Sequence, residues 1–404
     1  MTTNNNLNHN ANDQSMKKQG FTINRDLTNM HTDTIQDMTF LELGNNNYKL
    51  VSVGWDKSIR LWNCQVQKNN SYSMGIGMSS SNNSPKAFCS ISFAQKIDLK
   101  VYGLKVKHIP QMNSVLIVCG DCTIRQLNLA TMQVSILISL NALALDIFFV
   151  SQMNLFIIVT IDSKVSIYQT SNLQTATKVI GLISTPSCAD YEEGILLIGM
   201  ADDFWSMVDV RMFSQNIQQL PYMKCSLESP ITNVKINVPA LSIAATSCDG
   251  RIINSSYTIS NKNGINILTT PSDVNQCKRT FIFMGHGISR SKVQGKNKGP
   301  SNAYNITSLN TNQKSKLFAC TSGADGNVVF WDLTHKSKIK NFNFKEGISC
   351  GAISKDGNLG AFAIGYDWSK GIWGTNQVPQ SIAIGTYIFN EADLVCPEIL
   401  KKKK

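Results

Sequence analysis

Apolar and polar residues alternate over two short segments joined by a turn, and this arrangement recurs along the chain. In the clearest instance, residues 49–54 alternate in hydrophobicity, Asp56-Lys57-Ser58 forms the turn, and residues 59–62 alternate again. Period-two alternation on both sides of a turn predicts two antiparallel strands. A short acceptor side chain such as that of Asp56 can bond nearby backbone N–H groups, which favours the turn. The segment 317–331 repeats the design.

An aspartate followed six residues later by a closing residue, often aromatic, recurs seven times. The pairs are Asp56/Trp62, Asp121/Leu127, Asp162/Tyr168, Asp202/Val208, Asp249/Ser255, Asp325/Trp331 and Asp367/Trp373. Successive aspartates are 65, 41, 40, 47, 76 and 42 residues apart, and a spacing of about 40–45 is the period of a WD-type propeller blade. One hairpin cannot bury both of its faces, whereas seven arranged radially can, and closing the ring protects most strand edges. The sequence therefore predicts an all-β protein, a seven-bladed WD-repeat β-propeller. The Gly-His dipeptide that usually opens such repeats is absent from nearly all units, so the blades are degenerate.

The two long spacings each contain an insertion, and the chain ends are polar. The expected parts are a disordered, Asn-rich N-terminus (1–18), the propeller (19–395), a Ser/Asn-rich loop between the third and fourth strands of blade one (66–85), a basic excursion around blade five (260–303) and a basic C-terminal tail (396–404). Residues 20–28 are expected to supply the outer strand of the last blade and so close the ring.

Composition narrows the class of protein. Charged residues make up only 16% of the chain and apolar ones 42%, which suits a strand-rich, well-buried body. No apolar stretch is long enough to span a bilayer, and the start of the chain lacks the pattern of a secretory signal. The 11 cysteines are scattered; the one C-x-x-C, at Cys119 and Cys122, straddles a predicted turn without a second such pair. Buried reduced thiols, and hence the cytosol or nucleus, are expected.

The five histidines show no metal-ligand spacing and no Ser/His/Asp constellation. The sequence therefore predicts a protein that is not an enzyme and that uses no metal or cofactor.

Positive charge is concentrated late in the chain. The formal net charge is +11, and residues 274–324 contain eight Lys or Arg but no Asp or Glu. Such a patch favours an acidic partner, either nucleic acid or a glutamate-bearing peptide. The candidate nucleic-acid-binding residues in it are Arg290, Lys292, Lys296 and Lys298. The alternative is a solvated loop that only keeps the protein soluble.

Residues 347–371, which end in Tyr366-Asp-Trp-Ser-Lys-Gly371, resemble the final blade of the Rae/Gle-type mRNA export factors of the nuclear pore. In that family, Ile-Ser-x-x-x-Phe-x-x-x-Gly-Asn leads into the same hexapeptide. Supporting matches are Asp249-Gly-Arg-Ile252 and the segments 281–290, 303–306 and 323–332. The resemblance runs in order from about residue 20 to 395; it is strong over 281–391 and faint over 86–240. The sister family of Bub-type spindle-checkpoint propellers shares the blade order but lacks Tyr-Asp-Trp-Ser-Lys-Gly.

The resemblance implies an adaptor of the nucleus and the nuclear-envelope rim, partly cytoplasmic, without membrane contact. Such a propeller, monomeric within a hetero-complex, clamps on its top face the GLEBS segment of an FG nucleoporin, which presents two glutamates. Arg251 matches a family arginine that meets a glutamate, and Trp55 matches a tryptophan of the same face. From the residues alone, Trp55 precedes a turn and suits an interface anchor. The alternatives are blade packing for Trp55 and a solvent-reaching strand arginine for Arg251.

A second surface, on the side of blade six, is implied for RNA or ribonucleoprotein. Its matching residues are Phe283, Trp331, Lys336 and Lys338, a set suited to base stacking and phosphate attraction. Trp331 is also a core-type closing residue, Leu333 replaces a family lysine, and Ile161 replaces an aromatic of the top face. The alternative functions are a spindle-checkpoint adaptor that binds a GLEBS-like segment of a kinase, and a generic WD-repeat scaffold.

Overall fold

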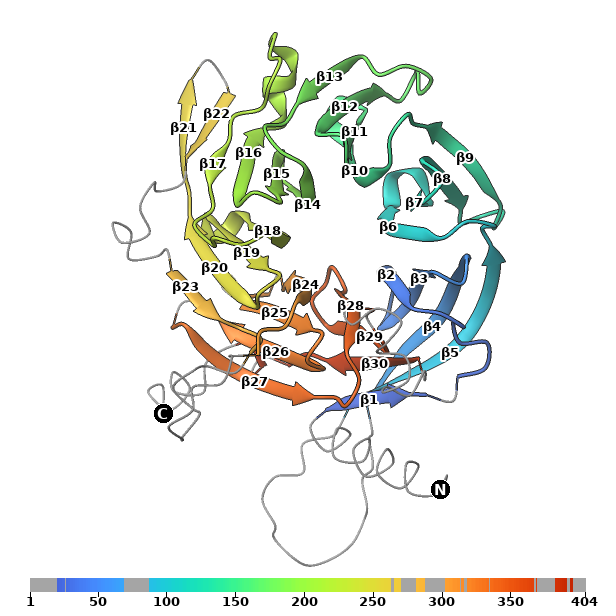
Figure 1. The fold of residues 1–404 in the computed structure, drawn as a ribbon. Helices are drawn as coiled ribbons and strands as arrows, with labels where there is room; N and C mark the ends of the chain where they lie inside the picture. Colours follow the sequence, from blue (N-terminus) through green and yellow to red (C-terminus); the bar gives the residue numbers. More distant parts are fainter. Residues whose placement is uncertain are drawn as a thin grey trace, which may run out of the picture.

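Seven four-stranded antiparallel sheets surround a central channel (Figure 1). This computed structural model describes residues 20–25, 27–68, 87–262, 265–269, 281–287, 302–312, 314–315, 318–333, 335–366, 368, 382–390 and 393–394. The predicted seven-bladed propeller is confirmed.

In each blade the four strands are named below in their order from the central channel to the rim. Blade one has β2 (Ile35–Gly44), β3 (Asn47–Gly54), β4 (Ser58–Lys68) and β5 (Ala87–Asp98); blade two has β6 (Gly103–Ile109), β7 (Ser114–Cys119), β8 (Thr123–Asn128) and β9 (Val134–Ser139); blade three has β10 (Ala144–Val150), β11 (Leu155–Thr160), β12 (Lys164–Gln169) and β13 (Lys178–Gly181). Blade four has β14 (Pro186–Glu192), β15 (Ile195–Met200), β16 (Phe204–Asp209) and β17 (Met223–Lys224); blade five has β18 (Ile231–Asn237), β19 (Ser242–Ser247), β20 (Arg251–Ser256) and β23 (Phe281–Met284). Blade six has β24 (Ile306–Thr311), β25 (Phe318–Gly323), β26 (Asn327–Asp332) and β27 (Ser337–Asn343); blade seven has β28 (Ile348–Ile353), β29 (Leu359–Ile364), β30 (Ala383–Ile388) and β1 (Phe21–Asn24).

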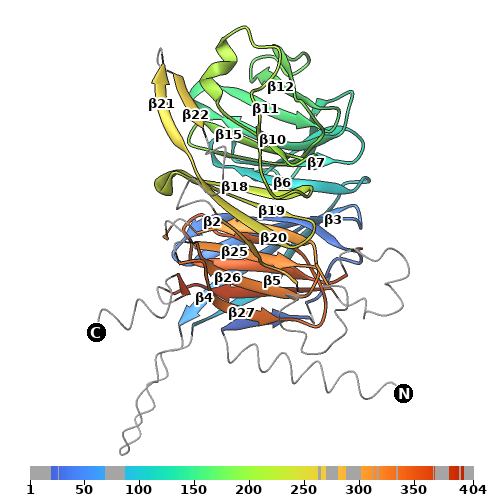
Figure 2. The same cartoon turned by 60° about the vertical axis from the view of Figure 1, so that its left-hand side comes forward.

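Short elements complete the described chain. They are the hairpin β21 (Thr258–Lys262) and β22 (Ile265–Thr269) and the 3-10 turns η1 (Pro110–Met112), η2 (Ser151–Met153), η3 (Val210–Ser214) and η4 (Val238–Ala240). The hairpin leaves blade five after β20 (Figure 2), and its strand β22 lies against β16 of blade four.

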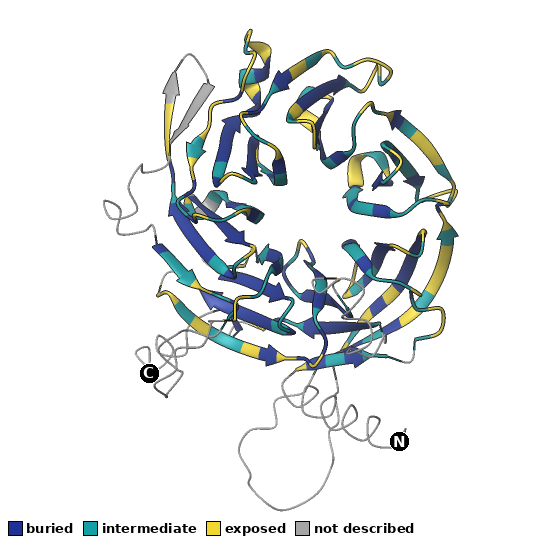
Figure 3. Cartoon of the chain, in the orientation of Figure 1, coloured by how far each residue is buried: buried dark blue, intermediate teal, exposed yellow. Residues whose placement is uncertain are grey.

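The second strand of each blade is the most deeply buried, because the sheets pack face to face. In blades two to seven these strands are buried at every position, and the dark blue strands of Figure 3 show the same pattern. Strands buried on both faces read as continuous apolar runs rather than alternating ones. This explains sequences such as Leu-Phe-Ile-Ile-Val in β11.

The ring is closed by the N-terminal strand. Residues of β1 pair in antiparallel register with β30, from Phe21 opposite Tyr387 to Asn24 opposite Ile384. Residues far apart in sequence therefore complete one sheet, as expected for the segment 20–28. Immediately after β1, the Arg25 guanidinium makes two bonds, 3.2 and 3.3 Å long, to the buried carboxylate of Glu346.

The turn aspartates find hydroxyl donors where the Gly-His dipeptide is missing. The bonds are Thr123 to Asp121 (2.6 Å), Thr160 to Asp162 (2.5 Å), Ser184 to Asp202 (2.6 Å) and Ser247 to Asp249. A turn aspartate next to a nearby hydroxyl therefore preserves the hairpin after the histidine is lost, which explains how degenerate blades keep the fold.

Every inner strand carries a β-bulge at its second residue. A bulge re-aims the extra side chain, and in three blades that side chain reaches the next blade. The hydroxyls of Thr232, Thr307 and Ser349 donate to the carbonyls of Ile306, Ile348 and Ile35, respectively, at 3.2, 2.7 and 2.7 Å. Each acceptor is the first residue of its inner strand, so neighbouring inner strands begin on one face of the ring. We call this the upper face.

Three expectations from the sequence need correction. The range 260–303 is not one excursion, because β23, the outer strand of blade five, lies within it. Residues 66–68, expected to belong to a loop, form the end of β4, and residues 69–86 lie outside the described part. In blade seven, β29 ends at Ile364 and β30 begins at Ala383, so a tight hairpin does not join these two strands, contrary to what the pair Asp367/Trp373 predicted; both residues of the pair lie outside the described part. Of residues 1–18 and 396–404 none is described.

Candidate binding surfaces

Within the described residues, two blades contain a buried chain of hydrogen bonds that ends on the turn aspartate. In blade one, Trp62 donates to the Ser52 hydroxyl at 2.9 Å, Ser52 lies 2.8 Å from His31 Nε2, and His31 Nδ1 lies 2.9 Å from Asp56. A carboxylate cannot donate, so Nδ1 carries the proton toward Asp56 and Nε2 accepts from Ser52. Gly54 makes room for the imidazole, since a Cβ there would lie 3.2 Å from His31 Nδ1 and 2.6 Å from a backbone oxygen.

Blade six repeats this chain with Trp331, Thr321, His286 and Asp325, over distances of 2.8, 2.9 and 2.8 Å. Trp331 is only 5% exposed. Its indole N–H is used inside the blade, so its main role is in the core rather than as an open stacking platform. The sequence alone left these two histidines without a role; the Gly-His dipeptide at 285–286 was the signal that could have identified one of them.

Burial lowers the pKa of His31 although Asp56 opposes the shift. The pKa of Asp56 is lowered to about 2, because bonds from His31 and Ser58 outweigh the effect of burial. On acidification the unfolded chain binds a proton at His31 near pH 6.5, before the folded chain does, so stability should fall below that pH. The contribution of Asp56 to the free energy of unfolding is fully present above about pH 3.8 and is lost only as the pH approaches 2.

We therefore expect a His31→Gln variant to be less stable at neutral pH but to lose less further stability between pH 6.5 and 4.5. The wild-type slope attributable to one such proton is at most about 1.4 kcal/mol per pH unit. Urea denaturation of both proteins across this pH range tests the expectation. If the free energy of unfolding changed with pH in the same way for the two proteins, His31 would not be the titrating group.

The upper face carries an exposed aromatic stack between blades one and two. Trp55 is 45% exposed and lies parallel to Tyr102, with ring centroids 5.2 Å apart and an interplanar angle of 10°. The Trp55 indole N–H donates to Gln36 Oε1 at 2.9 Å, and its backbone N–H donates to the Thr34 carbonyl at 3.0 Å. The ring is thus held in place before any partner arrives. Tyr102 was not predicted, because it lies in the loop before the next blade, outside the aspartate repeat.

The aromatic surface continues into blade seven. The Trp368 indole donates to the Thr34 hydroxyl at 3.0 Å, that hydroxyl donates to the carbonyl of Tyr366 at 3.0 Å, and the two aromatic rings lie 5.5 Å apart. Trp368 is as exposed as Trp55. Thr34, between these groups, therefore links the aromatic residues of blades seven and one. We call Trp55, Tyr102, Tyr366 and Trp368 the upper aromatic surface.

Arg251 lies on the same face as Trp55 but in blade five. Its Nε donates to Asp249 Oδ2 at 2.7 Å, and one third of its side chain is exposed. It pairs in register with Met284, an exposed residue at the end of β23. The two predicted peptide-binding residues therefore share a face, although three blades lie between their positions along the chain and the structure places no contact between them.

Four predicted nucleic-acid-binding residues come together on the outer side of blades five and six. Phe283 meets Trp331 edge-on at 4.9 Å, Lys338 lies 5.4 Å from the Trp331 ring, and Lys336 lies 4.5 Å from the ring of Phe281. Both lysines are exposed. We call these five residues the lateral surface. The remaining candidates, Arg290, Lys292, Lys296 and Lys298, lie outside the described residues, which stop at Gly287 and resume at Asn302; Gly287 bridges to Ala303.

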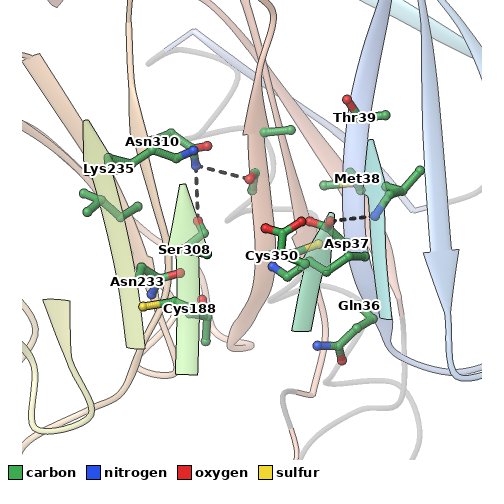
Figure 4. A pocket seen from close by; sticks show the side chains of 18 of the residues that line it. Gln36, Asp37, Met38, Thr39, Cys188, Asn233, Lys235, Ser308, Asn310 and Cys350 are labelled. Atoms are coloured by element: carbon green, nitrogen blue, oxygen red, sulfur yellow. Dashed lines mark hydrogen bonds between the residues drawn. The ribbon is translucent and has the colours of Figure 1, made fainter. Parts of the chain in front are cut away.

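The central channel forms a hollow of about 280 Å³ lined by all seven inner strands (Figure 4). Its lysines face carboxylates: Lys107 lies 3.2 Å from Asp146, and Lys235 lies 2.6 Å from Asp190. The pKa of Lys105 is raised, chiefly by the charge of Asp37. The paired charges join neighbouring blades and leave the channel without excess charge for a charged ligand.

Within the described residues, no three His, Cys, Asp or Glu side chains gather in a way that could hold a metal ion. The nine cysteines of that part are free thiols, and Cys119 and Cys122 flank the β7–β8 turn as expected. None of the helices described has the length and apolar character of a membrane span.

Comparison with known proteins finds similarity to WD-repeat and mRNA-export proteins. The family "WD domain, G-beta repeat" matches residues 25–63 and 291–332, which include β2, β3 and part of β4 in blade one and the first three strands of blade six. The chain is 34% identical to the Poly(A)+ RNA export protein of Schizosaccharomyces pombe over 86 residues, 21% of this chain and 24% of that protein. It is 32% identical to Protein RAE1 of Arabidopsis thaliana over 123 residues, 30% of this chain and 32% of that protein. It is 24% identical to mRNA export factor GLE2 of Chaetomium thermophilum over 204 residues, half of each chain. The chain thus matches between about a quarter and a half of the length of these relatives.

Proposed function

We propose that this chain, a seven-bladed WD40-repeat propeller similar to proteins named mRNA export factors, acts in mRNA export as a non-enzymatic adaptor of the nuclear pore. Its upper face would bind the GLEBS-type segment of a nucleoporin, and its basic surfaces would contact RNA or ribonucleoprotein. The observation that carries the proposal is the exposed Trp55–Tyr102 stack on the same face as Arg251.

The upper face supports the peptide partner in two ways. Trp55 and Tyr102 present a large, pre-oriented apolar surface, and aromatic residues of this kind are common anchors of protein interfaces. Arg251 keeps guanidinium donors in addition to those that meet Asp249, and these suit a glutamate of the partner. A segment that engages both must be extended, because it has to run from blade one to blade five.

The lateral surface supports contact with a single nucleic-acid strand. Phe283 and the two lysines offer an aromatic edge beside positive charge, which would hold bases and phosphates without regard to sequence. Trp331 would contribute through the ring surface beneath Lys338 rather than by stacking on an exposed face.

RNA binding should therefore weaken steeply with salt. Each lysine that meets a phosphate contributes about 0.7 to the slope of log K against log salt for single strands. We expect Lys336→Ala/Lys338→Ala to flatten that slope by about 1.4 in fluorescence-anisotropy titrations with an oligouridine probe, with Lys164→Ala/Lys178→Ala on blade three as the control. A parallel triple variant of Lys292, Lys296 and Lys298 tests the basic segment. If neither the double nor the triple variant changed the slope, these lysines would be solvated residues that do not contact RNA.

The cellular location of a tagged full chain tests the function. We expect a signal at the nuclear rim that becomes diffuse in Arg251→Glu, and accumulation of poly(A) RNA in the nucleus when the protein is depleted. A kinetochore signal in mitosis without rim staining would favour the checkpoint adaptor. A diffuse signal with normal RNA export would favour the generic scaffold.

A further inference from the structure

The outer edge of blade two is an uncharged, apolar strand. β9 reads Val-Ser-Ile-Leu-Ile-Ser and is the last strand of its sheet, so one side of its backbone has no strand partner among the described residues. Ile136, in the middle of β9, is 59% exposed. From Gln126 to Leu145 no residue carries a charge, in a protein with a net charge of +11. Natural proteins usually protect such an edge with charges, proline or a covering segment.

Other outer strands of the same ring are protected. β27 carries Lys338 and Lys340, and β5 carries Lys96 paired with Asp98. The end of β13 is met by an extended segment of blade four: Gly181 N–H donates to the Gln218 carbonyl at 2.8 Å, and Leu220 N–H donates back to Gly181 at 3.0 Å. In the described part of the chain, β9 has neither a charge nor such a covering segment. Blade three thus shows within this molecule how an extended segment covers an outer edge.

A hollow of about 420 Å³ adjoins the end of β9. Ser139 and Asn141 line it on one side, and Tyr168, Asp162 and Lys164 line it from blade three. Neighbouring blades diverge toward the rim, so a strand added outside β9 would direct every second side chain into the gap between blades two and three. The hollow therefore lies where one of these side chains would enter, and its Asp162–Lys164 pair, 2.7 Å apart, suits a polar group.

We propose that β9 is a docking edge for an extended segment of a partner protein, which adds a fifth strand to blade two through backbone hydrogen bonds. The segment would place an apolar side chain beside Ile136 and a polar one in the hollow. A partner fits better than a second copy of this chain, because two copies with a charge of +11 each repel one another. The hollow lies at one end of β9 and makes the site asymmetric, whereas two copies of the same edge would pair symmetrically. This site is separate from the upper aromatic surface and the lateral surface.

The test is a selection of phage-displayed octapeptides on the full-length protein, after depletion on an Ile136→Lys variant. The selected peptides are then titrated by fluorescence polarisation against wild type, Ile136→Lys and Ile183→Lys. Ile183 is a matched control because it is also an exposed isoleucine but lies in the loop between blades three and four. Equal melting temperatures of the three proteins show that the variants fold.

We expect the selected peptides to alternate apolar residues, to bind Ile136→Lys about tenfold or more weakly, to bind Ile183→Lys normally, and to slow amide exchange in β9. Failure to recover such peptides, or equal binding to Ile136→Lys, would overturn the proposal. A wild-type dimer in light scattering that Ile136→Lys dissociates would also overturn it, in favour of a second copy.

Discussion

Replacing Phe21 by alanine should lower the free energy of unfolding by about 3–5 kcal/mol, the usual cost of removing a buried phenylalanine side chain. Phe21 is 1% exposed and packs against four aromatic rings. The centroid of its ring lies 4.7 Å from that of Phe342, 5.3 Å from Phe344, 5.6 Å from Phe362 and 5.0 Å from Tyr387. It belongs to β1, the strand that joins the two ends of the chain in one sheet. Its loss would therefore weaken the closure of the ring as well as leave a cavity.

Thr22→Ala on the same strand is the control. Thr22 is only half buried, and its contact with Thr386 uses its backbone carbonyl, which the substitution keeps. We expect Thr22→Ala to cost less than about 1 kcal/mol. Urea denaturation followed by tryptophan fluorescence measures both. If Phe21→Ala cost no more than Thr22→Ala, then β1 would not take part in the cooperative fold, and closure by the N-terminal strand would be wrong.

Replacing Arg251 by glutamate should abolish binding of a GLEBS peptide. The change puts a carboxylate beside Asp249 and opposite the glutamates of the proposed partner, so attraction would become repulsion. Removing one partner of a bonded charge pair at an interface costs about 2–5 kcal/mol, and reversing its charge should cost at least as much. Isothermal titration calorimetry with a synthetic GLEBS peptide measures the loss.

Arg211→Glu is a suitable control for that experiment. Arg211 also bonds an aspartate two residues away, Asp209, but it lies in η3 rather than in a turn of the upper face. We expect its affinity for the peptide to match that of wild type. Equal affinity of Arg251→Glu and wild type would contradict the assignment of Arg251.

The architecture was predictable because the turn aspartate has a local physical role that survives change elsewhere. A carboxylate two residues before Ser58 or Thr123 bonds the same turn whether or not a histidine is present. Five of the seven repeat aspartates bond a residue two positions away, whereas Asp202 bonds the more distant Ser184. In blade seven, β30 begins only at Ala383, and no local signal in the sequence marks where a strand resumes after a long connection. For the same reason, β23 was hidden within a segment that reads as a basic excursion.

The residues of the binding surfaces were predictable only where a residue lies next to a turn in the sequence. The sequence places Trp55 at the end of a strand, so its exposure follows from local geometry. Tyr102 contacts it from the next blade, and that contact depends on how two sheets pack, which the sequence does not reveal. Trp331 illustrates the converse: the same residue type at a strand position becomes a core side chain, because Thr321 and Lys338 enclose it from two sides.

Affinity purification of the tagged full chain, with mass spectrometry of what it retains, tests the adaptor proposal most directly when wild type, Arg251→Glu and Lys336→Ala/Lys338→Ala are compared. The proposal predicts that wild type and the lysine variant both retain a nucleoporin that has a glutamate-bearing GLEBS-like stretch, and that Arg251→Glu loses it. Recovery of no nucleoporin by wild type, or equal recovery by Arg251→Glu, would contradict the proposal.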